Sequence, residues 1–312
     1  MNRIVVTGDE ILALALCLIF SDELEVFFYG RNCSNGFPVL TYPDIELLES
    51  GWWSVNGASD CLLPAKVADL IEPHLQKKQA LLPAGNYPDF ENISGDRCRQ
   101  LEPSLSGFFS RGQLLDSFYL ADRLQLKKNL LEALRQTDVE IMKKNSFAVK
   151  EAGQAELTVV VINSKQSLPE EITGGLRPCQ EIKKIYSSVE LPRHFFEFTP
   201  VLHGDSELIP YGGRLFISKK IKDCGTDGVF AGEVLSLLHG TYEICPFIYE
   251  QSFAPPAQEK CFCGIDGGPF FAALSRPAGE FLLLAPGYQR GIWMLSYIVN
   301  LCRSWLHGQD KF

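Results

Sequence analysis

The segment that decides the fold is RIVVTGDEILALALCLIFSDELEVFFY, residues 3–29. Its first five residues are mostly β-branched and predict a strand, and Gly8 marks the turn that follows. Residues 10–21 are apolar on almost every face and predict a buried helix, while residues 24–29 predict a second strand. Parallel neighbouring strands need a crossover of this kind, so the segment predicts a βαβ unit.

The turn before the helix can be compared with the dinucleotide-binding pattern Gly-x-Gly-x-x-Gly. In that pattern the first glycine makes the turn, the second admits the pyrophosphate, and the third packs the helix on the strand. The three positions hold Gly8, Glu10 and Ala13 here, and Asp9 lies between the first two. Gly8 and Ala13 suit the turn and the packing. The Glu10 side chain fills the space for the phosphates and carries the same sign of charge.

The second strand should end in an acidic residue that holds the ribose hydroxyls of a dinucleotide. It ends instead in Phe28, Tyr29, Gly30 and Arg31. Residues 3–31 alone therefore indicate a Rossmann-like architecture and leave open whether a nucleotide is bound.

Two further helices are predicted, at residues 65–77 and 121–136. The second is amphipathic, and we expect Leu124, Leu131 and Leu134 on its apolar face. A buried strand is predicted at 156–163 because that segment contains the run Leu-Thr-Val-Val-Val-Ile.

The second half of the chain has a different residue pattern. Residues 176–250 contain several β-like runs bounded by Pro or Gly, which predicts an antiparallel sheet. These runs lie at 182–189, 195–199 and 214–219. A last buried strand at 281–285 then leads through a glycine-flanked turn into a helix at 291–306.

The composition excludes some classes of function. The chain has 312 residues, of which 46% are hydrophobic and 21% are charged, and its net charge is −9. Nucleic acid and anionic membrane surfaces are disfavoured partners because both select basic proteins. The longest apolar stretch, 11–20, is half of the roughly 20 residues needed to span a bilayer. We therefore expect a cytoplasmic protein.

The cysteines and histidines show no metal-ligand spacing. Ten cysteines are scattered along the chain, and Cys261 and Cys263 form the one close pair. Two ligands do not complete a zinc site, so we expect small buried thiols in a reducing compartment. The five histidines have no ligand spacing either, and no metal is predicted.

Five segments, in order along the chain, carry a resemblance to a known family. They are Leu101-Glu102-Pro103, residues 146–149, residues 208–217, residues 266–271 and residues 284–292. Together they resemble the FAD-dependent amino-acid oxidases and dehydrogenases, of the glycine oxidase and D-amino-acid dehydrogenase kind. The third is similar to the family's Pro-x-x-x-Gly-Arg hairpin in the substrate sheet. The last two are similar to its Asp-Gly-x-Pro turn and its closing glycine motif beside the flavin.

The resemblance implies an α/β fold and a set of site residues. An FAD-binding-type Rossmann-like domain would comprise residues 1–62, 120–175 and 262–312, interleaved with an antiparallel-sheet substrate-type domain of residues 63–119 and 176–261. The residues implied to bind the cofactor are Gly8, Asp9, Glu10, Ile11, Ala13, Gly30, Arg31, Ala148, Asn163, Ser164, Gly267, Gly287, Gln289, Gly291 and Ile292. The residues implied at the catalytic site are Tyr288, Arg290 and Tyr211, with Tyr242, Tyr249 and Arg276 as further candidates.

The sequence also departs from the family pattern. Asn163-Ser164-Lys165 stands where the family has Ala-x-Gly, and Tyr288 stands where it has His. Ala254 takes the place of the arginine that holds the substrate carboxylate, a role that suits a bidentate guanidinium.

Three functions remain open on the sequence. The first is an FAD-dependent oxidoreductase acting on a small amine or amino acid. The second is a pseudoenzyme of the same fold that has lost FAD and binds a metabolite or a protein partner. The third is a Rossmann-like enzyme that uses another nucleotide.

Overall fold

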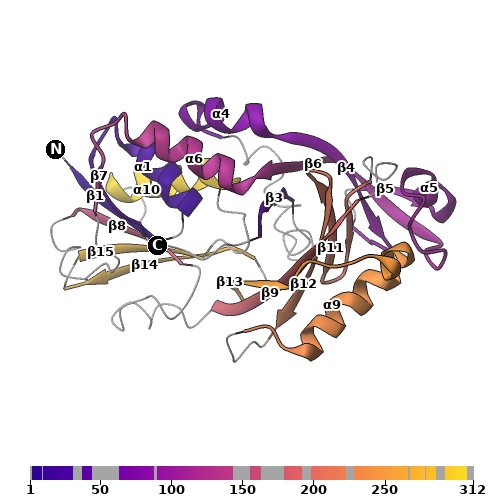
Figure 1. Ribbon diagram of the computed structural model, residues 1–312. Coiled ribbons are helices and arrows are strands. Elements are labelled where there is room, and N and C mark those ends of the chain that lie inside the picture. Colours follow the sequence, from indigo (N-terminus) through magenta and orange to yellow (C-terminus); the bar gives the residue numbers. More distant parts are fainter. Residues whose placement is uncertain are drawn as a thin grey trace.

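The protein contains two sheets that lie next to each other, with helices on their outer faces (Figure 1). The structure is a computed structural model, and it describes most of the chain. The described residues are 2–8, 10–30, 37–43, 63–87, 90–142, 155–162, 179–191, 198–222, 228–265, 268–277, 279–285 and 292–307.

The first sheet, sheet A, has six strands among the described residues, in the order β14-β15-β8-β1-β2-β7. Its strands are β1 (Arg3–Gly8), β2 (Glu25–Gly30), β7 (Glu140–Ile141), β8 (Leu157–Val161), β14 (Phe270–Arg276) and β15 (Gly279–Ala285). All neighbours run parallel except β14, which is antiparallel to β15. The strand predicted at 156–163 is therefore β8, at the centre of this sheet.

Four helices lie on one face of sheet A (Figure 1). They are α1 (Glu10–Phe20), α4 (Ala65–Ile71), α6 (Arg123–Leu134) and α10 (Leu295–Leu306). The predicted βαβ unit is confirmed, because β1, α1 and β2 follow one another and β1 pairs with β2 in parallel. α1 is buried all round because it packs against sheet A and against α4, α6 and α10.

Three details of the predicted helices are wrong. The helix predicted at 65–77 ends at Ile71, and a 3-10 turn, η2 (Glu72–His74), leads directly into the next strand. The apolar face of α6 is formed by Leu126, Leu130 and Leu134, whereas Leu124 is 66% exposed. The last helix begins at Leu295 because residues 292–294 form a turn.

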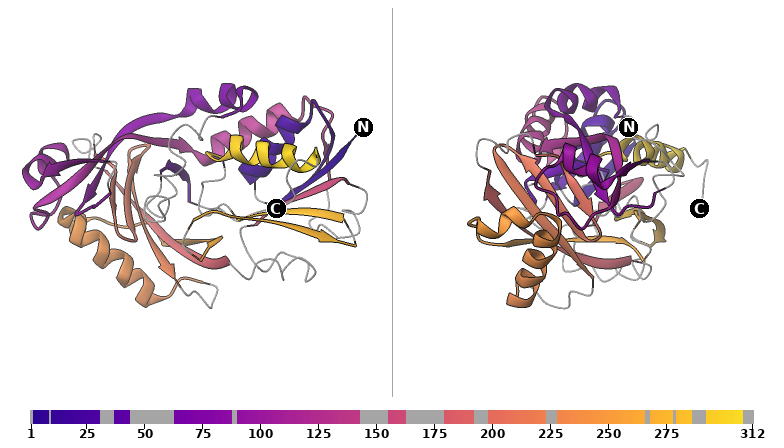
Figure 2. Two further views of the ribbon diagram at one scale, coloured as in Figure 1. Left: turned by 180° about the vertical axis from the view of Figure 1, so that it is seen from behind. Right: turned by 90° about the vertical axis from the view of Figure 1, so that its right-hand side faces the viewer.

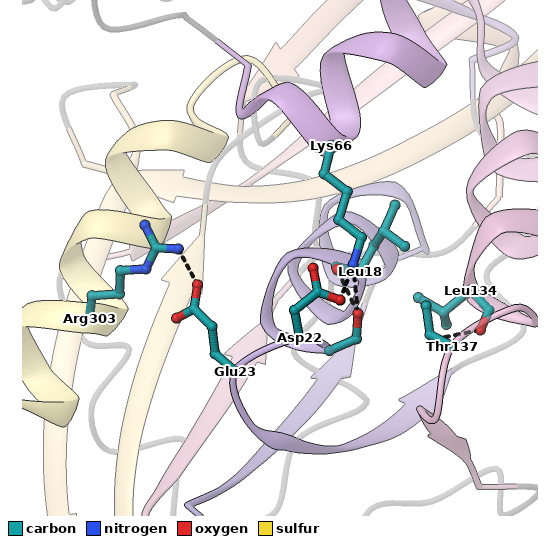
Figure 3. A network of polar contacts seen from close by, with 8 residues as sticks. Leu18, Asp22, Glu23, Lys66, Leu134, Thr137 and Arg303 are labelled. Atoms are coloured by element: carbon teal, nitrogen blue, oxygen red, sulfur yellow. Dashed lines mark hydrogen bonds and ion pairs between the residues drawn. The ribbon is translucent and has the colours of Figure 1, made fainter.

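The C-terminal end of α1 is tied to two helices that come from distant parts of the sequence (Figure 3). Lys66 of α4 donates to the Ser21 hydroxyl at 3.0 Å and to Asp22 at 2.8 Å. Arg303 of α10 forms an ion pair with Glu23. These contacts fix the three helices as one layer over sheet A.

The second sheet, sheet B, follows the order β13-β9-β12-β11-β10-β4-β6-β3, with β5 also paired to β6. Its strands are β3 (Val39–Tyr42), β4 (Gln76–Pro83), β5 (Glu91–Ser94), β6 (Arg111–Asp122), β9 (Cys179–Glu190), β10 (Val201–His203), β11 (Ser206–Tyr211), β12 (Arg214–Lys222) and β13 (Ala257–Gly264). The predicted antiparallel sheet is confirmed, with one parallel pair, β10 with β4. The short helix α5 (Gly95–Leu101) precedes β6.

One face of sheet B is covered by α9 (Ala231–Ile244), which a 3-10 helix, η6 (Pro246–Glu250), follows (Figures 1 and 2). The sequence predicted an antiparallel sheet within residues 176–250 and no helix there, so α9 is an addition to that prediction. Its buried residues recur at helical spacing, with Leu237, Thr241 and Ile244 turned toward the sheet. Of the strand predicted at 195–199, residues 198 and 199 are not in a strand, and residues 195–197 lie outside the described residues.

Sheet B curls until its two edges come together. β13 and β3 lie at opposite ends of the strand order. Glu259 of β13 forms an ion pair of 2.5 Å with Arg123, which directly follows β6. The same carboxylate accepts from the backbone N–H of Phe37, just before β3, at 3.1 Å. We call the contacts among Glu259, Arg123 and Phe37 the clasp.

The domain boundaries stay a prediction, although the two sheets draw on the chain in an interleaved way. β3 comes from the segment assigned to the first domain, yet it pairs with β6 in sheet B. Seven cysteines fall in the described segments, and six of them are buried. No helix in those segments is long and apolar enough to cross a membrane.

Gly8 ends β1 where the chain turns into α1. Its φ is +122°, and a Cβ added there would lie 1.9 Å from the carbonyl oxygen of Val161 in β8. Glycine is therefore required by the close approach of two neighbouring strands, whatever binds near the turn.

We expect Gly8→Ala to lower the free energy of unfolding by more than about 1 kcal/mol, because both the backbone angle and the space exclude a side chain. Gly107 has an ordinary φ and nothing within 4 Å of an added Cβ, so Gly107→Ala is the matched control. Urea unfolding measures both variants. Equal stability of the two would contradict this role for Gly8.

We expect Glu259→Gln to lower the free energy of unfolding by about 3 kcal/mol, because it removes the negative charge from a nearly buried ion pair with Arg123. The side chains of this pair are only 10% and 12% exposed. The Arg3–Glu25 pair is 33% and 45% exposed, and we expect Glu25→Gln to cost less than about 1 kcal/mol. Thermal or urea unfolding that ranks the two variants the other way would show that the clasp is not needed.

Candidate functional site

The first candidate site lies where β1 and β2 end and α1 begins. Glu10 is the first residue of α1, so the sequence supplies a carboxylate at the positive end of this helix. A dinucleotide pyrophosphate would need the same helix end. Two like charges about 4 Å apart repel by about 4 kcal/mol at an effective dielectric of 20. The side chains of Ile11 and Ala13 are buried in the core.

The end of β2 is the second part of this candidate site. Gly30 pairs with Gly8, so the two strands end side by side. A Cβ added at Gly30 would lie 2.8 Å from the ring of Phe28, which is itself buried. An acidic side chain at this position, as ribose binding requires, would have to displace that ring. An acidic side chain at Gly30, where a dinucleotide-binding strand would carry one, therefore does not fit beside Phe28 as the described residues stand.

The second candidate site is the inner face of sheet B, which we define as the face opposite α9. Strand register places Lys184 beside Lys220, Tyr186 beside Ser218, and Ser218 beside Glu207. Cross-strand neighbours share one face, so these five side chains lie together. The intervening residues, among them Ile185 and Ile217, pack on the other face with α9.

The inner face holds a buried ion cluster. Lys184 Nζ lies 2.5 Å from Glu207 Oε2, and Ser218 Oγ donates to the same oxygen at 3.1 Å. Lys220 Nζ lies 3.7 Å from Glu207 Oε1. The three charged side chains are at most 2% exposed. Ionic groups this deeply buried are stable only when they are paired with each other or with further polar groups.

The ring of Phe37 packs into the same face. It is fully buried, and it meets Tyr186 edge-on at 5.3 Å and Phe216 at 5.8 Å between ring centroids. Lys184 Nζ lies 4.3 Å from the centre of the Phe37 ring, a cation–π contact. Because the clasp holds the Phe37 backbone, the chain fills this part of the inner face with its own side chains.

Tyr186 contacts the Phe37 ring, and the charges of Glu259 and Arg123 act on its hydroxyl. Burial, with the negative charge of Glu259 adding to it, raises the pKa of Tyr186 to about 12, and the positive charge of Arg123 opposes this shift. The phenol is therefore neutral over the whole physiological range. It can donate a hydrogen bond there, but it is a poor candidate for a base.

Tyr211 lines a groove at the open end of sheet B. The groove has a volume of about 330 Å³. Its lining residues are Gln76, Lys78, Leu191, Phe198, Pro210, Tyr211, Gly212 and Gly213. Burial raises the pKa of Tyr211, and the charge of Asp122 raises it further. Tyr211 is the predicted catalytic residue that the structure places in a hollow.

The other candidate site residues that the structure describes lie on different elements and do not come together. Tyr242 of α9 and Tyr249 of η6 contact each other with ring centroids 5.0 Å apart and planes tilted by 57°, on the outer side of sheet B, and Tyr249 is 73% exposed. Arg276 is exposed at the end of β14, and Ile292 is buried under the helix layer. No group of three possible metal ligands occurs in the described segments.

Most of the predicted site falls outside the described residues, so those assignments stay predictions. The residues concerned are Asp9, Arg31, Ala148, Asn163, Ser164, Gly267, Gly287, Tyr288, Gln289, Arg290 and Gly291.

The ion cluster and the clasp were missed by sequence reasoning. The available signal was a charged residue at an inward position of each of several neighbouring strands, at Lys184, Glu207, Lys220 and Glu259. Inward and outward positions alternate along a strand, so these positions become visible only once the face that α9 covers is known.

We expect the stability of the protein to fall as the pH rises from about 10 to about 12, in part because of Tyr186. An unfolded tyrosine ionises near pH 10 and the folded one near 12, so folding keeps the proton and loses stability across that window. Tyr186→Phe should flatten this part of the profile, as measured by urea unfolding at each pH. An unchanged slope would contradict the assignment, and Tyr249→Phe is the exposed control.

No protein-family model matches this sequence, and no curated protein sequence matches it. Solved structures match along its whole length. Glycine oxidase from Geobacillus kaustophilus has a TM-score of 0.78 at 16% identity, over 100% of this chain and 96% of that one. Glycine oxidase from Bacillus cereus ATCC 14579 has a TM-score of 0.74 at 13% identity, over 100% and 96%.

Iminodiacetate oxidase from Chelativorans sp. BNC1 has a TM-score of 0.71 at 13% identity, over 99% of this chain and 96% of that one. At such identities the likeness concerns the fold. The parallel sheet under a helix layer and the curled antiparallel sheet beside it agree with these neighbours. The chain therefore has the fold of the FAD-dependent amino-acid oxidase family.

Proposed function

We propose that this chain is a binding protein built on the amino-acid oxidase fold, which has lost FAD and holds a small metabolite. The observation that carries the proposal is the residues at the adjacent ends of β1 and β2. A carboxylate-bearing residue, Glu10, begins α1, and the ring of Phe28 takes the space beside Gly30. Both ends of a dinucleotide would meet a mismatch there.

The inner face of sheet B supports the same proposal. Phe37 and the cluster of Lys184, Glu207 and Lys220 fill part of the face that looks toward the rest of the fold. The Phe37 ring and the paired charges occupy this part of the face with the chain's own side chains.

The competing function is oxidation of a small amine or amino acid by bound FAD, and the full-length likeness to three oxidases favours it. Flavin-dependent amine oxidation requires a hydride path to the cofactor and little acid–base chemistry from the protein. Tyr288 and Arg290 would then stand at the substrate, as the family resemblance implies. This function requires that FAD bind despite Glu10.

The test is FAD binding by the purified full-length chain. We expect no flavin absorbance bands as isolated, and no change in FAD fluorescence anisotropy up to about 100 μM added FAD, because a 4 kcal/mol penalty weakens binding roughly 1000-fold. Glu10→Gly should tighten FAD binding toward that factor. Glu10→Gln removes the charge and keeps the volume, so it separates the two effects.

A yellow protein with a stoichiometric flavin would overturn the proposal in favour of the oxidase. Saturable binding of NAD or ATP in the same assay, without FAD binding, would support a Rossmann-like enzyme that uses another nucleotide. Adding Phe28→Ala and Gly30→Glu to Glu10→Gly tests the ribose end. If these three residues are the cause, this triple variant should bind FAD more tightly than Glu10→Gly alone.

A further inference from the structure

Exposed apolar side chains gather on and around the outer surface of α9, which faces away from sheet B. Seven large apolar side chains are exposed in the described part of the chain, and four of these lie on α9, at its ends or beside it. The four are Phe108, Phe230, Leu235 and Tyr249, whose exposed fractions are 94%, 48%, 67% and 73%. Single exposed apolar residues are normal on a protein surface, whereas a patch of them marks an interaction surface.

The first half of this surface is acidic and lies on α9 and η6. Leu235 and Tyr242 are seven residues apart, which is two helical turns, so they lie on the same side of α9. Tyr249 of η6 extends this stripe, because its ring centre lies 5.0 Å from that of Tyr242. Glu243, with a side chain that is 64% exposed, and the exposed Glu250 directly follow the two tyrosines in the sequence. We call these five residues the acidic half.

The second half is basic and belongs to α5 and to the loop between α5 and β6. The backbone N–H of Ser106 in this loop donates to the carbonyl of Ile244, the last residue of α9, at 2.8 Å. α5 and α9 accordingly lie at the same end of the molecule (Figure 1). Phe108 projects from the loop, and Arg97 before it and Arg111 after it are both exposed. We call Phe108, Arg97 and Arg111 the basic half.

The two halves carry opposite charge, and the ion pairs around them leave this difference in place. Asp96 lies 2.6 Å from Arg99 and offsets the charge of that arginine, so the two arginines of the basic half remain. On the other half, His239 lies 3.5 Å from Glu243, and Glu250 adds a second carboxylate. A face that carries both charges side by side is complementary to a second copy of itself.

We infer that this face forms a reversible homodimer with twofold symmetry, in which the acidic half of each copy contacts the basic half of the other. A twofold interface makes every contact twice, so each copy supplies Phe108 as an anchor to the apolar stripe of its partner. Aromatic and arginine side chains are enriched in such interfaces. A partner that carries one sign of charge would be repelled by one of the two halves. This inference does not rest on the proposed binding function, because α9 covers the face of sheet B opposite the inner face.

The exposed area sets the expected strength of this dimer. A stable interface of standard size buries about 800 Å² on each partner. A buried aromatic side chain contributes about 150–250 Å². Phe108, Leu235 and Tyr249 together supply roughly half of the standard area, and the charged side chains around them form the rim. We therefore expect a dissociation constant on the order of 10 μM, as suits a transient complex.

The test is sedimentation velocity of the full-length chain from about 1 to about 200 μM, where a dimer of this strength is partly and then mostly formed. We expect Leu235→Arg to weaken the dimer at least about tenfold, because it removes an apolar anchor and places a positive charge opposite the partner's basic half. Leu124→Arg is the matched control, because Leu124 is 66% exposed and also lies on a helix, but that helix is α6 over sheet A. This control should leave the dissociation constant unchanged.

Two charge-reversed variants test the matching of the two halves. Glu243→Arg with Glu250→Arg makes both halves basic, and Arg97→Glu with Arg111→Glu makes both halves acidic. Each double variant alone should dimerise at least about tenfold more weakly, because like charges meet at both contacts. An equimolar mixture of the two should form heterodimers with nearly the dissociation constant of the unmodified chain.

Three results would overturn this interface: a chain that stays monomeric at about 200 μM, equal effects of Leu235→Arg and Leu124→Arg, or no association in the mixture of the two charge-reversed variants. Circular dichroism of each variant checks that the fold is intact. FAD titration of the same samples tests the proposed function separately. A chain that binds FAD and also dimerises through this face contradicts the proposed function alone, and a chain that does neither contradicts the interface alone.

Discussion

The contact on which the rest of this structure depends is the ion pair between Arg123 and Glu259. It joins the first residue of α6 to β13, and thus connects the two edges of a curled sheet across its open side. The same carboxylate holds the Phe37 backbone, so one side chain positions an edge strand, a helix start and a core ring. α6 packs on α1 and α4, which links the curvature of sheet B to the helix layer on sheet A.

The closure of the sheet explains how it tolerates charges inside. Lys184, Glu207 and Lys220 come from three adjacent strands, β9, β11 and β12, and meet because those strands are in register. Burying each of them alone would cost several kcal/mol. Their mutual contacts and the cation–π contact of Lys184 with the Phe37 ring offset part of that cost. Because these side chains are fully buried, this part of the inner face stabilises the sheet and does not contact solvent.

The sequence predicts sheet A well and sheet B only in outline. The βαβ unit could be predicted from local signals, because two β-branched runs joined by an apolar helix usually pair as parallel neighbouring strands. The strands β4 and β6 carry mixed polar and apolar residues, because one part faces the core and another part faces solvent, so their pattern is weak. α9 was missed because its Leu237 and Ile244 lie inside a stretch rich in β-like runs.

Part of the candidate site could be predicted from the sequence, and part of it could not. Gly8, Glu10 and Gly30 could be interpreted from sequence because they occupy fixed positions in a known turn. The clasp could not, since Arg123 and Glu259 are far apart in the chain and their meeting depends on sheet curvature.

The order of strands in sheet A has a consequence for how the chain is made. β1 pairs on one side with β2, which follows closely, and on the other with β8, where Ile4 meets Leu157. β8 in turn pairs with β15, and the end of α1 is held by Arg303 of α10; both partners are synthesised much later. During synthesis the first βαβ unit therefore leaves the ribosome with one strand edge and one helix face unsatisfied. The chain must be synthesised as far as Arg303 before both are covered, and until then the apolar strand edge is exposed to aggregation.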